Sequence, residues 1–282
     1  MKKALMGILL CLSLSVWGFS SGLSLRLGGG LSYLTGGDLN SALQSQNEYY
    51  QAQFTSVSGE FQKLSLGLDF DAELVWNLSP SLGLGVGAGF LRASRESGVS
   101  PSLGLIGLTK TIGPSVSVIP VTLNAHYWLA LGPRLNLHVS AGPGLYVSFF
   151  RYREQYDLPI LIIDTDLSYS PKPAVTFGFQ GLVGLEMAVG DSFWLTLDVV
   201  GRFASVTGLN GDWTETGHSF GSPFTTSGVG SLWSYEDKVD GSTYIFTQVS
   251  SRPPSGSNLN NIRNASVGLS GVGARIGLRL RL

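Results

Sequence analysis

The stretch from residue 64 to residue 78 alternates between apolar and polar side chains over its whole length. Successive side chains of a β-strand point to opposite faces, so this stretch has one apolar and one polar face. The apolar face comprises Leu64, Leu66, Leu68, Phe70, Ala72, Leu74, Trp76 and Leu78, and the polar face comprises Ser65, Gly67, Asp69, Asp71, Glu73, Val75 and Asn77. A soluble barrel turns its apolar face inward. Three acids among small neighbours instead favour the interior of a narrow closed barrel whose outside contacts lipid.

The same period of two recurs along the chain, and none of the apolar faces carries a charge. Each stretch is at least as long as the roughly 9–11 residues that a tilted transmembrane strand needs. The pattern predicts an all-β fold, a closed antiparallel eight-stranded up-and-down transmembrane β-barrel. Its strands are expected at about 23–33, 64–78, 82–90, 119–129, 135–149, 175–187, 193–203 and 272–282.

Short and long connections alternate between these stretches. Three are tight turns, at Ser79-Pro80-Ser81, Gly132-Pro133 and Gly190-Asp191, each rich in turn-forming residues. The other four, at about 35–62, 92–114, 152–172 and 207–264, are long. This alternation is typical of outer-membrane barrels of Gram-negative bacteria, which have short periplasmic turns and long extracellular loops. We therefore expect an integral protein of the bacterial outer membrane with both termini in the periplasm.

Two details of the long connections refine this expectation. Asp240-Gly241 predicts a type I′ hairpin between 231–239 and 242–250. If that hairpin crossed the membrane, the barrel would have ten strands, but Glu236, Asp237 and Lys238 would then lie near the apolar band, which favours an extracellular hairpin. Residues 38–44 predict a short helix capped by Asp38.

The N-terminus has the pattern of a cleaved signal peptide. Lys2 and Lys3 precede an apolar run from 4 to 17 that is too short to cross a bilayer, and cleavage is expected after Gly18 or Ser20. The domains predicted are thus a signal peptide at 1–20 and a barrel at 21–282. Without the two lysines, the net charge falls from −1 to −3. The chain has no basic run, so no nucleic-acid partner is expected.

Aromatic residues on the apolar faces gather at the two ends of the predicted strands. Two such rings of aromatics typically mark the two membrane–water interfaces. The predicted aromatic girdle consists of Trp76, Tyr127 and Phe193 near the tight turns, and of Tyr33, Phe90, Phe149 and Phe203 near the long loops.

The inward faces carry a set of charged residues and two histidines. An eight-stranded barrel is only wide enough for side chains to fill its interior, so buried charges there must be paired. Counting from the turns predicts Glu73, His126, His138, Asp198 and Arg275 at comparable depth, with the two histidines close to directly opposite each other. Glu186 and Arg26 are expected nearer the tight turns, and Asp69, Asp71 and Arg202 nearer the long loops. The complete predicted lumen charge network is Arg26, Asp69, Asp71, Glu73, His126, His138, Glu186, Asp198, Arg202, Arg275 and Arg279.

Three interpretations of this lumen remain open from the sequence. It forms a salt-bridged plug, with glycines 83–89 leaving room for long side chains; or it forms a narrow porin-like channel sensitive to protonation of His126 and His138. The third, a metal site at Glu73, His126 and His138, is the least favoured, since two histidines and a carboxylate often share a polar interior without metal. No cofactor is expected.

The stretch from Ile119 to Trp128 (IPVTLNAHYW), followed by Leu137 to Val147 and by the C-terminal strand, resembles the small outer-membrane β-barrel superfamily of OmpA-, OmpX- and OmpW-like barrels. The resemblance implies the barrel fold, outer-membrane lipid as surroundings and the outer-membrane assembly machinery as a partner during biogenesis. It constrains function weakly, because members include anchors, adhesins, channels and a few enzymes. Members commonly end in an aromatic residue, whereas this chain ends in Leu282.

Catalysis is not expected. No histidine has outward parity, and only His218, beside Ser219 and near Asp212 and Glu215, could serve a site at the barrel rim. The last long connection instead sets aromatics among Ser, Thr and Gly, which suits either an extracellular protein or glycan ligand or packing of the loop on itself. These aromatics are Trp213, Phe220, Phe224, Trp233, Tyr235, Tyr244 and Phe246. The function predicted is a non-enzymatic structural or surface-interaction role through the loops; the alternative is the narrow channel.

Overall fold

The computed structural model describes residues 22–103 and 106–282. The predicted signal peptide lies outside the described residues. Within those ranges, no helix combines the length and the apolar character needed to cross a membrane.

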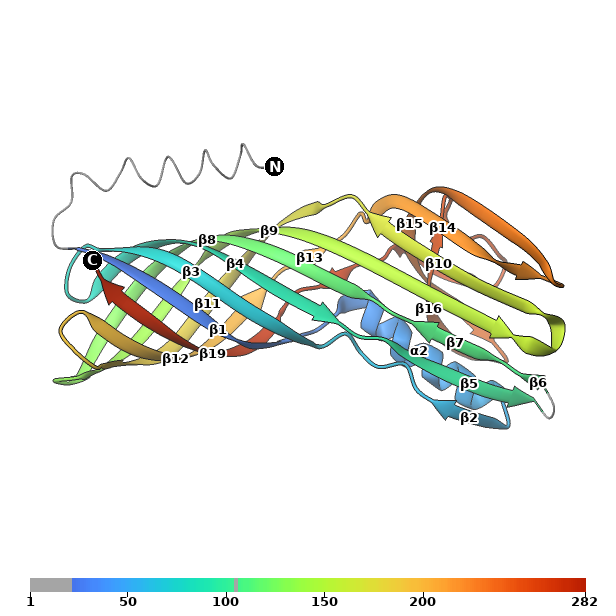
Figure 1. Ribbon diagram of the computed structural model, residues 1–282, viewed down its shortest axis with the longest axis horizontal. Helices are drawn as coiled ribbons and strands as arrows, with labels where there is room; N and C mark the ends of the chain where they lie inside the picture. The colour runs from blue at the N-terminus through green and yellow to red at the C-terminus, as the bar shows by residue number, and fades with distance from the viewer. Residues whose placement is uncertain (1–21, 104–105) are drawn as a thin grey trace.

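Eight strands form a closed antiparallel barrel, as predicted (Figure 1). Each strand pairs with the next along the chain, and the last pairs with the first, with Ser24 opposite Arg281 and Leu34 opposite Gly271. In ring order the strands are β1 (Leu23–Leu34), β3 (Leu66–Asn77), β4 (Leu82–Ser94), β8 (Ser115–Gly132), β9 (Leu135–Leu158), β11 (Ala174–Ala188), β12 (Phe193–Phe203) and β19 (Gly271–Arg281). The three tight turns and the C-terminus lie at one end of the barrel, the short-turn end, and the long connections lie at the other, the long-loop end.

The outer face of the barrel carries a continuous apolar belt. On β8, the side chains of Ile119, Val121, Leu123, Tyr127, Leu129 and Leu131 are exposed, while the alternate residues from Pro120 to Trp128 are buried inside. The twelve residue steps from Ile119 to Leu131, at about 3.3 Å each and a tilt of roughly 40°, give the belt a height of about 30 Å. This matches the hydrocarbon thickness of a bilayer.

Above the belt, toward the long-loop end, the polarity of the two faces is inverted. On β8, Val116 and Val118 face inward and are buried, while Ser115 and Ser117 face outward. The same change occurs on β9, where Phe150 and Tyr152 are buried inside and Arg151 is exposed outside. The wall is therefore built for an apolar exterior over the belt and for an aqueous exterior beyond it.

The inversion explains one wrong prediction. Leu64 belongs by parity to the outward apolar face, yet it is only 1% exposed, whereas Leu66 is 62% exposed. Strand β3 begins at Leu66, and Leu64 lies before it in the buried core of the long-loop end.

The four long connections are mostly strands rather than irregular loops. They extend the barrel into an elongated outer segment, which consists of the helix described below, the end of β9 and the additional strands (Figure 1). These strands are β2 (Ser56–Gly59), β5 (Ser97–Leu103), β6 (Ile106–Gly107), β7 (Thr109–Ile112), β10 (Ile163–Pro171), β13 (Ser205–Val206), β14 (Asn210–Ser219), β15 (Ser222–Val239), β16 (Ser242–Ser250), β17 (Leu259–Asn264) and β18 (Val267–Gly268); a 3-10 turn, η1, spans Pro159–Leu161.

The predicted hairpin at Asp240-Gly241 is present as β15 and β16. It lies outside the barrel ring, which excludes the ten-stranded alternative.

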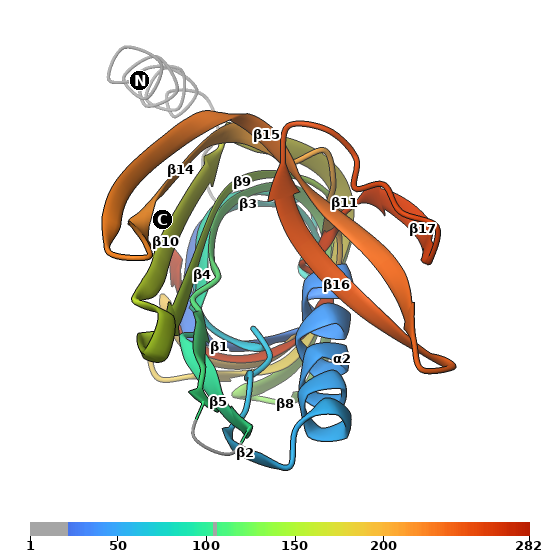
Figure 2. The same cartoon turned by 90° about the vertical axis from the view of Figure 1, so that its right-hand side faces the viewer.

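Helix α2 (Gly37–Gln53) lies against one side of the barrel opening in the view along the axis (Figure 2). It buries Leu39, Ala42 and Leu43 in an apolar core that also includes side chains of the barrel wall and of the outer strands. The helix is longer than predicted, and Asp38 is not its cap: the N-cap is Gly36, at φ 72°. Asp38 instead accepts hydrogen bonds from the backbone N–H of Ser266 (3.0 Å) and from Arg263 (2.8 Å).

Candidate functional site

All eleven residues of the predicted lumen charge network lie on the inner wall of the barrel. Ten of them are buried, and Asp71 is half-buried. Every barrel strand except β4 supplies at least one of them, and their side chains converge because the barrel is narrow. They form two connected clusters along the barrel axis.

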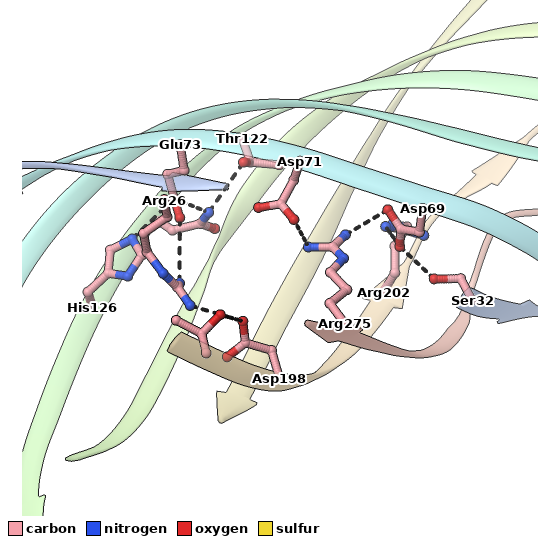
Figure 3. Close-up of polar contacts among 12 residues, drawn as sticks. Arg26, Ser32, Asp69, Asp71, Glu73, Thr122, His126, Asp198, Arg202 and Arg275 are labelled. Carbon is pink, nitrogen blue, oxygen red and sulfur yellow. Dashed lines mark hydrogen bonds and ion pairs between the residues drawn. The ribbon is translucent and has the colours of Figure 1, made fainter. Parts of the chain in front are cut away.

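The cluster nearer the long-loop end is centred on Arg275 of β19, which reaches between Asp71 and Asp69 of β3 (Figure 3). Its Nη2 donates to Asp69 Oδ1 at 2.9 Å, and its Nη1 lies 2.9 Å from Asp71 Oδ1. Asp69 Oδ2 also accepts from Arg202 Nη2 (3.1 Å) and from Ser32 Oγ (2.5 Å). The prediction that Arg275 lies level with Glu73 is thus wrong. Barrel shear displaces β19 along the axis, and counting residues from the turns ignores that displacement.

The cluster nearer the short-turn end is centred on Arg26 of β1. Its Nη2 donates to Asp198 Oδ2 at 3.1 Å, and its Nη1 lies 3.9 Å from Glu73 Oε2. Its Nε lies 3.7 Å from Oε1 of Glu186, a fully buried carboxylate. One guanidinium therefore holds three carboxylates from three strands in place.

The two histidines belong to this lower cluster and stack on each other. His126 pairs across the strands with Ser140, and His138 with Trp128, so the histidines are offset by two residues rather than directly opposite. Even so, their rings lie 5.2 Å apart and nearly parallel, and His126 Nδ1 lies 2.9 Å from His138 Nε2. His126 Nε2 lies 3.1 Å from Glu73 Oε1.

The carboxylate of Glu73 determines which atoms donate and which accept in the hydrogen bonds that link His138, His126 and Glu73. An ionised carboxylate only accepts, so a neutral His126 donates through Nε2 to Glu73, and its Nδ1 accepts from Nε2–H of His138. Asn124 donates to the same Glu73 oxygen at 2.7 Å. With both imidazoles neutral, each then carries its proton on Nε2, and His138 Nδ1 lies 3.7 Å from Oε1 of Glu186. The arrangement places a hydrogen-bonded chain of titratable groups across the lumen.

Arg279 closes the lumen at the short-turn end. Its guanidinium carbon lies 4.9 Å from the ring centre of Trp128 and 4.6 Å from that of Trp194. Its Nη1 also lies 3.2 Å from Glu186 Oε2. Below it, a vestibule of about 510 Å³ opens to solvent and is lined by Trp194, Arg279 and Arg281, among others. A cation between two indoles, tied to a buried carboxylate, makes a rigid floor.

Glycine on β4 makes room for these side chains. A Cβ atom at Gly85 would lie 2.5 Å from Glu73 Oε1 and 2.5 Å from His126 Nε2. Both distances are too short for a carbon atom. The glycine wall of β4 is therefore matched to the polar groups that it faces.

The lumen between the clusters is filled. The cavity lined by Asp71, Glu73, Asn124 and Arg275 has a volume of about 10 Å³, which is about the space of one water molecule. With neutral histidines, four arginines and five carboxylates leave a net charge of −1 in the network. Above the network, inward side chains of four barrel strands (Leu34, Leu91, Val118 and Phe150) belong to the same buried apolar cluster as residues of the outer segment. Ion pairs and an apolar core thus close the lumen in succession.

Sequence reasoning missed several uncharged members of the network. Trp128, Trp194, Ser32, Asn124 and Thr196 all have the inward parity of their strands. Thr196 donates to Asp198 at 3.2 Å. Their inward parity predicts that they line the lumen, but a criterion based on charge does not select them.

The two other sites considered from the sequence have different surroundings. Among residues 22–103 and 106–282, no group of three or more His, Cys, Asp or Glu side chains is arranged to hold a metal ion. His218 contacts Asp164 of β10 (Nδ1 to Oδ1, 2.9 Å) rather than Asp212 or Glu215, and both partners are exposed.

Most aromatics of the last connection pack within the outer segment. Tyr244 and Phe246 each lie 5.4 Å, ring centre to ring centre, from Tyr49 of α2, and Trp233 donates to the Ser250 carbonyl at 3.2 Å. Phe220 is the exception and is 72% exposed. The seven residues of the predicted aromatic girdle, Tyr33, Trp76, Phe90, Tyr127, Phe149, Phe193 and Phe203, are exposed or half-buried on the outer face.

Comparison with known proteins gives similarity of structure only. No protein-family model matches the chain. No curated protein matches it either. Among solved structures, the chain is similar to the outer membrane protein OprG from Pseudomonas aeruginosa, at 10% identity and a TM-score of 0.41, covering 93% of this chain and 97% of that one. It is also similar to a major outer membrane protein from Thermus thermophilus, at 15% identity and a TM-score of 0.36, covering 94% and 100%.

A third similar structure is the toluene transporter TbuX from Ralstonia pickettii, at 11% identity and a TM-score of 0.17, covering 94% of this chain and 90% of that one. Scores this low carry no argument about function. The eight-stranded barrel itself is established by the strand register of this chain.

Proposed function

We propose that this protein is an integral β-barrel of the bacterial outer membrane, closed along its lumen, that acts through its outer segment in a structural or surface-interaction role. The observation that carries the proposal is the combination of an apolar belt about one bilayer thick with a lumen filled by paired charges. An apolar surface of this size is unfavourable in contact with water, which supports insertion into a membrane. A filled lumen leaves no path for a solute, which supports a role for the parts of the protein outside the barrel.

The distal end of the outer segment offers a surface for such a role. The turn between β9 and β10 meets the turn between β14 and β15, where Gly221 N–H donates to the Ile162 carbonyl at 3.2 Å. Ile162 and Phe220 both have positive φ angles, 51° and 52°, and expose 63% and 72% of their surface. Exposed apolar residues on a strained backbone, with Ile160 and Leu161 beside them, favour contact with another macromolecule.

A narrow channel is the alternative function. The vestibule at the short-turn end supports it, since a solute could enter there. Passage would require Arg279 to leave its two indole rings and Glu186, and Arg26 and Arg275 to leave their carboxylates. We regard that sequence of ruptures as too costly for an open pore at rest.

Site-specific labelling tests the proposed location and orientation. Residues 22–282 contain no cysteine, so each introduced cysteine is a single target. Ser227→Cys lies on exposed β15 of the outer segment, and Ser192→Cys lies exposed at the turn between β11 and β12. We expect a membrane-impermeant maleimide to label Ser227→Cys in intact cells and Ser192→Cys only after lysis. Labelling of Ser192→Cys in intact cells, or recovery of the protein in the soluble fraction, would contradict the proposal.

A further inference from the structure

A group of cationic side chains lies on the outer face directly above the apolar belt. We call it the basic band. Arg92 is the next outward residue after Phe90 on β4, and Arg151 is the next after Phe149 on β9. The band consists of Lys63, Arg92, Arg95, Arg151 and Lys172, all exposed.

Strand register places Arg92 and Arg151 close together on the barrel. Arg92 pairs with Ser117 of β8, and Arg151 pairs with Ser115 of the same strand. Only β8 therefore separates the two arginines, and β4 and β9 lie about 10 Å apart across it. At this height β8 presents only Ser115 and Ser117 to the outside, so both guanidinium groups face the same open surface.

The cations of the band lack acidic partners. Among the described residues, Arg92, Arg95, Arg151 and Lys172 make no ion pair within 4.0 Å, and Lys63 contacts only the amide oxygen of Gln44, at 2.7 Å. In contrast, Arg153 is paired with Asp166 and Arg263 with Asp38. The cations of the band are thus without a direct carboxylate partner, whereas Lys110, Arg153 and Arg263 of the outer segment each have one.

A groove adjoins the band and opens onto the apolar belt. Its volume is about 770 Å³, and its lining includes Lys63, Arg95 and the lipid-facing Leu66. Glu60 is the one carboxylate among its described lining residues. A groove with cations above and an exposed leucine below suits a molecule that has a charged head and an apolar tail.

The band extends from the start of β3 to the start of β11 and does not continue onto β12 and β19. On those two strands, the residues just beyond the belt are Ser205, after Phe203 of β12, and Ser270, before Val272 of β19. At the short-turn end of the described residues, Arg134 is an exposed cation in the turn between β8 and β9. It supplies a control, because it lies at the other end of the barrel from the band.

We propose that the basic band and its groove bind the phosphorylated headgroup of an anionic lipid in the leaflet around the long-loop end. The lipid's acyl chains would lie on the belt at Leu66, Leu68 and Phe90, and its phosphates would contact Arg92, Arg95 and Arg151. Arginine matches phosphate with two parallel N–H···O bonds, which a hydrated lysine does not provide. The inference rests on the proposed membrane location and orientation.

The test compares lipids that differ only in phosphate. The protein is refolded into vesicles of zwitterionic phospholipid, folding is verified by heat-dependent gel mobility, and binding of diphosphorylated lipid A is measured against lipid A without phosphates. A basic side chain near an anionic membrane surface contributes on the order of 1 kcal/mol. Arg92→Gln/Arg95→Gln/Arg151→Gln should therefore weaken binding about 100-fold. Arg134→Gln should leave it unchanged.

Each other outcome overturns the inference in a recognisable way. Equal binding of the phosphate-free lipid, or undiminished binding by the triple variant, would show that the band does not recognise phosphate. Displacement of the lipid by inorganic phosphate at equal concentration would identify free phosphate as the ligand instead. Failure of the unmodified protein to insert into vesicles would contradict the proposed function itself, which separates the two claims.

Discussion

Arg275 and Asp69 lie 206 residues apart in the sequence, yet Nη2 of the arginine donates to Oδ1 of the aspartate at 2.9 Å inside the barrel. The strands that carry them, β19 and β3, are not neighbours in the sheet, since β1 lies between them. Both residues lie opposite Gly30 of β1, so the bond passes over that glycine on the inner wall and joins the last strand of the chain to an early one. It belongs to a network whose members are all buried or half-buried, so its value to the fold lies in leaving no charge without a partner.

Replacing Arg275 tests this network. Arg275→Met leaves Asp71 without a cation, while Asp69 keeps Arg202 and Ser32. We expect the free energy of unfolding to fall by about 1–3 kcal/mol, because the half-buried carboxylate of Asp71 loses its cation. Urea unfolding in vesicles, followed by heat-dependent gel mobility, measures it.

The control for Arg275→Met removes the charge of Asp71 as well. Arg275→Met/Asp71→Asn should recover part of the lost stability, since the unpaired carboxylate is gone. A double variant no more stable than the single variant would show that arginine packing, rather than charge pairing, holds the lumen.

The glycine wall of β4 gives a steric prediction. Gly85→Ala places a carbon against Glu73 and His126, so we expect a loss of about 1–3 kcal/mol in unfolding free energy. Gly132→Ala is the control, because no atom lies within 4 Å of the added carbon. Equal stability of the two variants in urea unfolding would mean that the lumen is loosely filled at this height.

Asp38 anchors helix α2 in a pH-dependent way. Burial raises the pKa of Asp38, but hydrogen bonds from Arg263 and Ser266 outweigh that effect, and the pKa lies below its usual value. The contact therefore stabilises the fold fully above the unfolded-state pKa of about 4, and its contribution is lost as the pH falls through the lower folded-state value.

The matching variant is Asp38→Asn. At neutral pH it should lower the unfolding free energy of the outer segment by about 1–2 kcal/mol, and the gap to the unmodified protein should close toward about pH 3. Glu48→Gln, a change to a residue of the same helix that makes no ion pair among the described residues, is the control. A gap that is the same at neutral and acidic pH would contradict the assigned role of Asp38.

We expect the apolar core of the outer segment to be destabilised without unfolding of the barrel. Leu43 is buried between α2 and the outer strands, so Leu43→Ala should destabilise that core by about 2–5 kcal/mol. We expect faster proteolysis of the outer segment, whereas heat-dependent mobility of the barrel stays unchanged. Ser41→Ala, at an exposed position of the helix, should have neither effect. Loss of barrel mobility in Leu43→Ala would show that the two parts fold as one unit.

The barrel could be predicted because apolar and polar residues alternate strictly along each strand where one face contacts an apolar exterior and the other faces a polar lumen. All eight strands were therefore found, with errors only at their ends. Leu64 was assigned to the wrong face because the polarity of the wall inverts above the belt. The inversion is visible in the sequence at Phe150 and Tyr152, whose inward parity is apolar, beside outward Arg151 and Arg153.

The outer segment was not predictable in the same way. Burial alternates along β14, but its more buried side carries Gly211, Trp213, Glu215 and Gly217, so the sequence shows no alternation of apolar and polar residues. Parity alone predicts which residues face the lumen. It does not predict which of them form ion pairs, because the height of Arg275 relative to its partners depends on barrel shear. The start of α2 was misplaced for a local reason: Gly36 supplies the left-handed backbone at the helix start, which freed Asp38 to bind Ser266 and Arg263.

The most direct test of the closed lumen is the current through a planar lipid bilayer that contains the refolded protein. Recordings should run from about pH 5 to about pH 8, the range over which histidine charge commonly changes. Heat-dependent gel mobility must first establish that the inserted protein is folded. We predict no discrete current steps at any pH in this range. Discrete steps from the folded protein, above all steps that change with pH and vanish in His126→Gln, would contradict a closed lumen and establish the channel in its place.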